Sequence, residues 1–225
     1  MTGCRGIPLG HLTLLTGKSI NGKMAVAHQT LANIQIARGR DIDSIAVLDF
    51  TQTIQQNDMV NFGVDPRYSD CINPPHPSQT VRLIYSLICG YGYRAVLING
   101  LADVLTMDGM DEMFCAATPK INWALGQTRC AMICLDESTM GQDQRLIASG
   151  NYLSQIASLH IDLDNQKERH FITPADEANV QAQLRYSHWA LGGSCILDLP
   201  WLAARYQPFA MSRIDDSVTV CAIST

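Results

Sequence analysis

Several features that would place this chain in a specialised class are missing from its sequence. No CxxC pair occurs, no apolar run reaches the ~18 residues that a membrane span needs, and no repeat or low-complexity tract divides the chain. Cations are not in excess, since 16 Lys and Arg stand against 21 Asp and Glu. The charge therefore gives no general attraction to nucleic acid. The N-terminus carries no basic-then-apolar signal, so we expect a soluble cytoplasmic protein without a membrane partner.

The residues that are present indicate a globular protein. Hydrophobic residues make up 47% of the 225 residues and charged residues 16%. The eight cysteines lie mostly within apolar runs, and we expect reduced, buried thiols instead of disulfides. No spacing of His, Cys and Asp is typical of a zinc site, so no metal centre is expected. His28 and His160 are expected to be core histidines with satisfied hydrogen bonds.

The first half of the chain alternates short apolar runs with longer helical stretches, which predicts parallel strands joined by helices. The strands are expected at Leu12–Thr16, Ser44–Asp49, Ala95–Asn99 and Ala131–Leu135. The helices are expected at Lys23–Arg38, at Ser78–Tyr91 with Ser78 as N-cap, and at Lys120–Thr128. The proline-rich segment 58–77 is expected to be a loop.

The pattern changes near residue 157, where the apolar runs become shorter. We expect strands at Ala157–Leu163, Ala182–Tyr186, Ser194–Leu199 and Ser217–Ile223, forming an antiparallel extension of the same sheet. The fold class is then three-layer α/β with a mostly parallel sheet. Residues 1–225 are expected to form a single domain.

A phosphate-binding loop is predicted directly after the first strand. It reads Gly17, Lys18, Ser19, Ile20, Asn21, Gly22, Lys23 and Met24, which is the pattern GxxxxGK between a strand and a helix. Glycines let the backbone N–H groups surround a phosphate, and the helix N-terminus adds partial positive charge. Lys23 supplies a cation for the outer phosphates.

The last position of the loop departs from the pattern. A Ser or Thr hydroxyl normally holds Mg²⁺ there, whereas this chain has Met24, whose thioether is a poor ligand for a hard cation. We expect Met24 to pack under the helix. Lys18 would then neutralise part of the charge of a bound phosphate, or else point to solvent.

From Gly6 to about Leu199 the chain resembles the bacterial RecA recombinase family. The similar stretches are Gly6–Gly10 before the phosphate loop, Gly63–Asp65, the strand at 95–99, the strand leading to Glu137, and residues 150–162. The resemblance implies a RecA-like P-loop fold. It also implies that RecA's N-terminal filament-docking segment and C-terminal domain are missing.

The departures from RecA affect its catalytic positions. The aspartate that orients the metal corresponds to Asn99, the catalytic glutamate to Thr51, and the γ-phosphate sensor to Glu137. The adenine-stacking aromatic falls near Asp58. Arg185 and His188 are the only candidates for contacts to a neighbouring subunit's nucleotide.

The two stretches that correspond to RecA's DNA-binding loops are 101–119 and 138–150. The first is acidic and contains no Lys or Arg before Lys120, which disfavours DNA binding because phosphates require clustered cations.

Two functions remain open. The first is a non-catalytic RecA paralogue that binds ATP or ADP weakly or not at all, without dependable Mg²⁺. It would act through other proteins, with a RecA-family protein as one candidate, in recombination or repair. The second is an ATP-hydrolysing recombinase with a rebuilt metal site. Because three catalytic positions have changed, the first is favoured. The assignment to recombination rests on the resemblance alone.

Overall fold

The computed structural model describes residues 7–17, 22–36, 43–74, 76–136, 152–164, 179–187 and 193–198. In these ranges the strands are β1 (Leu12–Gly17), β2 (Ile45–Asp49), β3 (Ser69–Ile72), β4 (Ala95–Asn99), β5 (Ala131–Asp136), β6 (Leu159–Asp164), β7 (Asn179–Ser187) and β8 (Gly193–Asp198). The helices are α1 (Lys23–Ile36), α2 (Gln56–Asn61), α3 (Thr80–Gly90), α4 (Leu101–Leu105) and α5 (Met110–Thr128).

The strands form one sheet in the order β3-β2-β4-β5-β1-β6-β7-β8. Strands β1 to β6 run parallel, so their carboxyl ends meet along one edge. Strand β7 pairs antiparallel with β6 and with β8, in the region where short C-terminal strands were expected. The expected strand at 217–223 lies outside the described residues.

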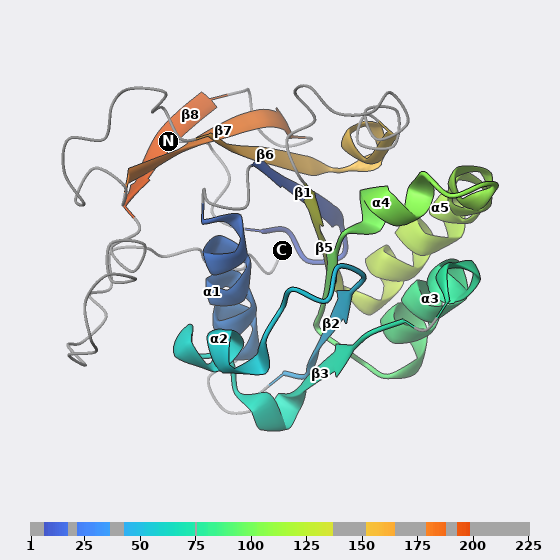
Figure 1. Cartoon of the computed structure of the whole chain (residues 1–225), viewed down its shortest axis with the longest axis horizontal. Coiled ribbons are helices and arrows are strands. Elements are labelled where there is room, and N and C mark those ends of the chain that lie inside the picture. The colour runs from blue at the N-terminus through green and yellow to red at the C-terminus, as the bar shows by residue number, and fades with distance from the viewer. Residues whose placement is uncertain are drawn as a thin grey trace.

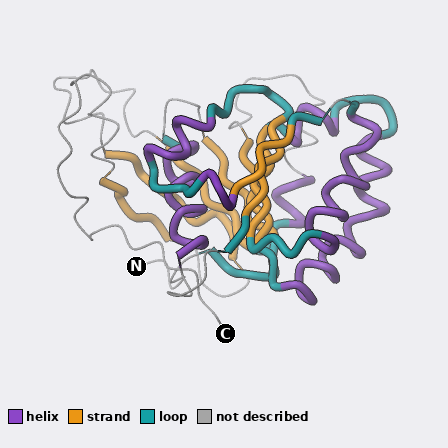
Figure 2. The backbone as a smooth tube through the Cα atoms, turned by 90° about the horizontal axis from the view of Figure 1, so that it is seen from below, coloured by secondary structure: helices purple, strands orange, loops and turns teal. Residues whose placement is uncertain are grey.

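Helices cover both faces of the sheet and make three layers (Figure 1). Helices α1 and α2 lie on one face, and α3, α4 and α5 on the other. Figure 2 shows the same separation from below. The α/β class predicted from the sequence is therefore confirmed.

Each face of the sheet carries its own hydrophobic core, because alternate residues of a strand point to opposite sides. Leu14, Leu48 and Ile98 belong to the core under α3 and α5. Leu15 and Val47 belong to the core under α1. Strands β2, β4 and β5 are buried along their whole length, as expected for parallel strands covered on both faces.

Two segments expected to be irregular contain regular structure. The segment 58–77 includes most of α2, a 3-10 turn at Pro66–Tyr68, and β3. The acidic segment 101–119 is largely helical, since it forms α4 and the first half of α5. Both expectations were wrong. The prolines of 58–77 were given too much weight, since Pro66 opens a turn. The loop at 101–119 was expected from the resemblance to a DNA-binding loop, whereas Asp111 and Glu112 lie in the first turn of α5, where acidic residues are favourable.

The predicted cap of α3 is also wrong. Gln79 occupies the N-cap position and makes no side-chain capping bond. Ser78 lies within a 3-10 turn, Pro77–Gln79, and its N–H donates to the side chain of His76. The chain thus enters α3 through a second short turn, so the helix starts two residues later than predicted.

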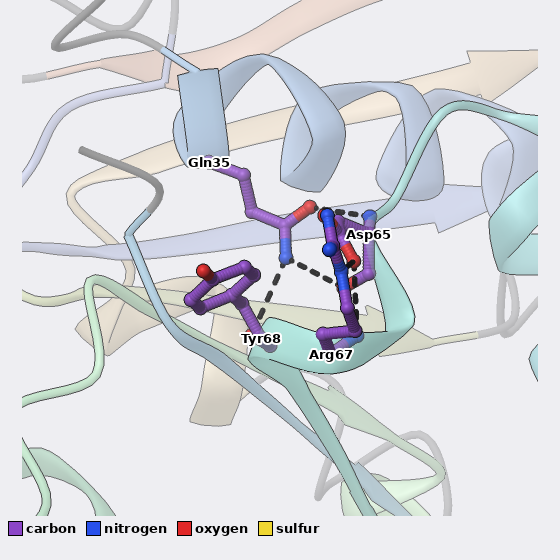
Figure 3. A network of polar contacts seen from close by, with 4 residues as sticks. All are labelled: Gln35, Asp65, Arg67 and Tyr68. Carbon is purple, nitrogen blue, oxygen red and sulfur yellow. Dashed lines mark hydrogen bonds and ion pairs between the residues drawn. The ribbon is translucent and has the colours of Figure 1, made fainter. Parts of the chain in front are cut away.

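The C-terminal part of α1 is fixed by its contacts with the loop before β3 (Figure 3). Asp65 N–H donates to Gln35 Oε1 at 2.8 Å, while Gln35 Nε2 donates to the carbonyl oxygens of Asp65 and Tyr68. Gln35 is buried, so these bonds satisfy a polar group that would otherwise destabilise the core. These bonds hold the C-terminal end of α1, whereas Lys23 lies at its N-terminal end.

Candidate functional site

The phosphate loop predicted from the sequence begins where β1 ends. Gly17 closes β1 with φ of 145°, and Gly22 precedes α1 with φ of 73°. A Cβ on Gly17 would lie 2.4 Å from the carbonyl oxygen of Leu163 in β6, so only glycine allows the two strands to approach this closely. Lys18, Ser19, Ile20 and Asn21 lie outside the described residues.

Lys23 is the first residue of α1 and is buried, with 4% of its surface exposed. Its Nζ donates to the carbonyl oxygen of Asp136 at 2.8 Å, at the end of β5. An ammonium group is rarely buried without partners, because leaving water is costly. The fold therefore holds a cation at the carboxyl edge of the sheet, beside the strand that precedes the loop.

Met24 follows Lys23 and packs partly buried against the core under α1. This agrees with the expectation that Met24 packs under the helix. The position that would bind Mg²⁺ in a working phosphate loop thus contributes to the core.

Asn99 and Asp49 face each other at the ends of β4 and β2, where they are register partners. Asn99 Nδ2 lies 3.0 Å from Asp49 Oδ1, 2.7 Å from Thr51 Oγ1 and 3.0 Å from Thr53 Oγ1. We name these four residues the Asp49 network. The amide donates to a carboxylate at the position where the RecA resemblance implies a carboxylate facing a metal.

Asp49 accepts hydrogen bonds from four donors. They are Thr51 N–H, Thr51 Oγ1, Asn99 Nδ2 and Ile54 N–H. Since a carboxylate has about four acceptor positions, these bonds occupy most of its capacity. Asp49 is 3% exposed, so the hydrogen bonds of its carboxyl oxygens come from the fold and not from bulk solvent.

The sequence interpretation missed Asp49. It matched Asn99 and Thr51 to the family's acidic positions and overlooked the carboxylate that ends the buried run Ile45–Asp49. A signal was available, because an acidic residue at the carboxyl end of a parallel strand lies at the edge where α/β proteins place their sites. Thr51 itself is exposed, but it takes part in the network.

Gly100 makes room for this network. Its φ is +78°, and a Cβ there would lie 2.5 Å from Thr51 Cγ2. Phe50 N–H donates to the carbonyl oxygen of Asn99 at 3.0 Å and extends the pairing past the ends of β2 and β4. The main chain therefore holds Thr51 against Asn99.

His28 and His160 were expected to be buried and fully hydrogen-bonded. Each of them meets only one of these two conditions. His28 is buried in α1, but neither ring nitrogen has a hydrogen-bond partner within the described part of the chain. Burial lowers the pKa of His28 to about 4, although Asp58 partly offsets this effect. His160 is only partly buried and bonds to Thr16 Oγ1 and to Ser154 Oγ, each at 2.9 Å.

The bonds of His160 reach Asp162 through Thr16. Thr16 Oγ1 donates to Asp162 Oδ1 at 2.9 Å, so its lone pairs are available to accept from His160 Nε2. This chain of side chains joins β1 to β6 one residue before Gly17. It fixes the last residue before the phosphate loop.

Three further predicted site residues have no described side chain. Glu137 and His188 lie outside the described residues, and Arg185 lies on β7, for which only the backbone is described. Asp58, where the adenine-stacking aromatic was expected, is exposed on α2. The structure therefore brings together Gly17, Lys23 and Asn99, and adds Asp49.

Reduced, buried thiols were expected, and this holds for two of the five cysteines whose side chains are described. All five are free thiols, but only Cys130 and Cys134 are buried, while Cys71, Cys89 and Cys115 are exposed. Burial raises the pKa of Cys130 to about 12 and that of Cys134 further. These two thiols are therefore unreactive core residues.

Within the described ranges, no group of three His, Cys, Asp or Glu side chains could hold a metal ion. A span long and apolar enough to cross a bilayer is likewise not found among the described helices. Comparison of the chain with protein-family models and with curated proteins found no match.

Proposed function

We propose that this chain is a RecA-like P-loop domain that binds the phosphates of a nucleotide without Mg²⁺ and without hydrolysing them, and that it acts by contacting other proteins. Lys23 carries this proposal, because its buried ammonium lies at the carboxyl edge, next to the loop of pattern GxxxxGK. A phosphate can replace the carbonyl oxygen of Asp136 as the acceptor of that ammonium.

The strand order supports the proposed fold family. Strand β1 lies between β5 and β6, and the chain leaves β1 through the loop to enter α1. Ligands of open α/β sheets bind outside the carboxyl ends of the strands. Gly17, Lys23, Asp49 and Asn99 all lie at that edge.

The proposal that the protein does not hydrolyse ATP rests on the Asp49 network. Hydrolysis needs a metal that bridges the outer phosphates and a group that orients or deprotonates water. Met24 packs in the core, Asn99 offers an amide, and Thr51 is bonded to Asp49. Loss of a general base alone lowers rates by about 10²–10⁴.

One observation favours the alternative of an active ATPase with a rebuilt metal site. Asp49 is a carboxylate one strand away from the expected acidic position and could orient metal-bound water. To do so it would have to exchange some of its four donors for that water. The cytoplasmic location, a role in recombination, and contacts with a RecA-family protein remain part of the proposal, on the resemblance alone.

Calorimetric titration of the whole chain with ADP tests the phosphate site. Lys23→Ala should weaken binding at least about tenfold, since a charge-assisted hydrogen bond contributes ~1.5–3 kcal/mol. Lys120→Ala, which removes an exposed cation from α5, is the matched control and should leave the affinity unchanged. Equal weakening by both variants, or no binding by the wild type, contradicts the proposal.

A phosphate-release assay tests the second part. The wild type should show no ATP turnover above that of Lys23→Ala. Turnover by the wild type that Lys23→Ala abolishes would instead establish the ATPase alternative, with Asp49 as its metal-orienting carboxylate.

A further inference from the structure

Helix α5 lies on the side of the sheet away from α1 (Figure 1), and it carries a stripe of exposed residues. Its members recur every three or four residues, which places them on one face of the helix. They are Gly109 at the N-cap, then Glu112, Ala116, Lys120 and Trp123, all exposed. Trp123 is 62% exposed, which is unusual for so large an apolar side chain.

The charges of this stripe are arranged symmetrically about Ala116. Glu112 lies four residues before Ala116 and Lys120 four residues after it, about 6 Å away on each side at the helical rise. Neither side chain makes an ion pair within the described part of the chain. A second, antiparallel α5 crossing at Ala116 would bring Glu112 of each copy opposite Lys120 of the other.

The shape of the surface fits the same arrangement. Trp123 and Gly109 lie seven residues on either side of Ala116, so Trp123 of one copy would face Gly109 of the other. Gly109 borders a cavity of about 700 Å³ that is also lined by Leu105, Met107 and Tyr152. Apart from its two chain neighbours, none of the described residues has an atom within 4 Å of the place where a Cβ on Gly109 would be, which leaves room for an indole on that side.

A groove of about 600 Å³ between α3 and α5 adds apolar surface beside the stripe. Tyr85 and Met113 line it and are 38% and 37% exposed. Ala116 borders both the groove and the cavity, so a small residue stands at the point where two helices would cross. Small residues at a crossing let helices pack closely.

We propose that this stripe is a two-fold interface between two copies of this chain. A self-complementary patch is what an isologous dimer requires, because each contact occurs twice. Burial of the two Trp123 side chains would supply the largest apolar contacts, one toward each end of the interface, and the two Glu112–Lys120 pairs would set the antiparallel orientation. This interface does not involve Lys23 or the phosphate loop, so the inference is independent of the proposed nucleotide binding.

Sedimentation equilibrium of the whole chain tests the interface. The wild type should form a dimer whose dissociation constant rises with salt. Trp123→Ala should raise that constant about tenfold or more, as loss of an interface hot spot does. Ile36→Ala is the matched control, since Ile36 is 63% exposed but lies on α1, across the sheet; it should leave the dimer unchanged.

Charge reversal makes the test specific to this geometry. Glu112→Lys should dissociate the dimer, because it places like charges opposite each other twice. The double variant Glu112→Lys/Lys120→Glu should restore it, since the opposite charges face each other again. A wild type that is monomeric at every concentration, an assembly insensitive to Trp123→Ala, or a double variant no stronger than Glu112→Lys would each overturn the proposal. Circular dichroism of each variant verifies folding.

Discussion

The two sides of the candidate site differ in the hydrogen-bond partners of their buried charged residues, Lys23 and Asp49. On the β1 side, Lys23 donates to the carbonyl oxygen of Asp136, and the proposed phosphate would replace this acceptor. On the β4 side, Asp49 accepts from four donors supplied by its own neighbourhood. A cation that can exchange its acceptor is suited to binding a ligand. A carboxylate whose oxygens are already bonded to main-chain and side-chain donors is suited to stabilising the fold. This difference is the physical basis for proposing binding without catalysis.

The first way to test the comparison is to disturb the β1 side at Gly17. Gly17→Ala should lower the free energy of unfolding by at least about 3 kcal/mol, because φ of 145° strains an alanine and its Cβ would lie 2.4 Å from a backbone oxygen. Urea denaturation measures the effect.

Two other glycines provide the controls for Gly17→Ala. Gly92 has φ of +70° but open space around it, so an alanine there is strained without a clash. Gly92→Ala should lower the free energy of unfolding by about 1–2 kcal/mol. Gly126 is helical and also open, and Gly126→Ala should stabilise by up to about 1 kcal/mol. If Gly17→Ala costs no more than Gly92→Ala, the close approach of β1 and β6 is not required.

A second test uses His28, a buried basic group whose ring nitrogens have no hydrogen-bond partner among the described residues. His28 lies on the same helix as Lys23, and burial lowers its pKa from 6.5 to about 4. The unfolded chain therefore binds a proton between these pH values when the folded chain does not. Stability is lost as the pH falls through this window, by about 2 kcal/mol between pH 7 and pH 5.

His28→Leu removes this contribution. The variant should be at least as stable as the wild type at pH 7 and should exceed it increasingly toward pH 5. Denaturation series at pH 7, 6 and 5 give the difference between the two proteins, in which the other titrating groups cancel. Parallel loss of stability in both proteins would show that His28 is not buried as a neutral group.

A third test converts the β4 side into a metal site. Asn99→Asp places a second carboxylate about 3 Å from Asp49 Oδ1, where the amide nitrogen now lies 3.0 Å away. Repulsion between the carboxylates and the lost donor should lower the free energy of unfolding by about 2 kcal/mol at pH 7. The loss should be smaller at lower pH, where the pair can share a proton.

Mg²⁺ distinguishes this effect from simple loss of a hydrogen bond. Mg²⁺ should raise the melting temperature of Asn99→Asp and leave the wild type unchanged, because two adjacent carboxylates attract a hard cation. Asn99→Ala is the control, since it loses the donor without adding a charge and should show no response to Mg²⁺. A wild type stabilised by Mg²⁺ in the absence of nucleotide would contradict our view of the Asp49 network.

The sequence predicted the framework better than the contacts. Buried parallel strands consist of near-continuous apolar runs, so β2, β4 and β5 were located to within a residue. The loop pattern GxxxxGK located Lys23 because its residues are adjacent in the chain. Asp49 and Asn99 were not linked, since they are 50 residues apart and only the pairing of β2 with β4 brings them together.

Helix α5 shows another limit of prediction from sequence. Its first half carries Asp111, Glu112 and Pro119 and was expected to be a loop, yet it packs against the core through Met110 and Phe114. Tertiary packing outweighed the local signals. The resemblance to a DNA-binding loop had also favoured an irregular segment at that position.

In the proposed function, phosphate binding depends on Lys23 and not on a metal. The decisive experiment is calorimetric titration of the wild type with ATP, once with Mg²⁺ and once with excess EDTA. We expect the two dissociation constants to agree within about twofold, since no described side chain at the site is arranged to hold the ion. An affinity that falls tenfold or more when Mg²⁺ is removed would contradict the account and would favour a rebuilt metal site at Asp49.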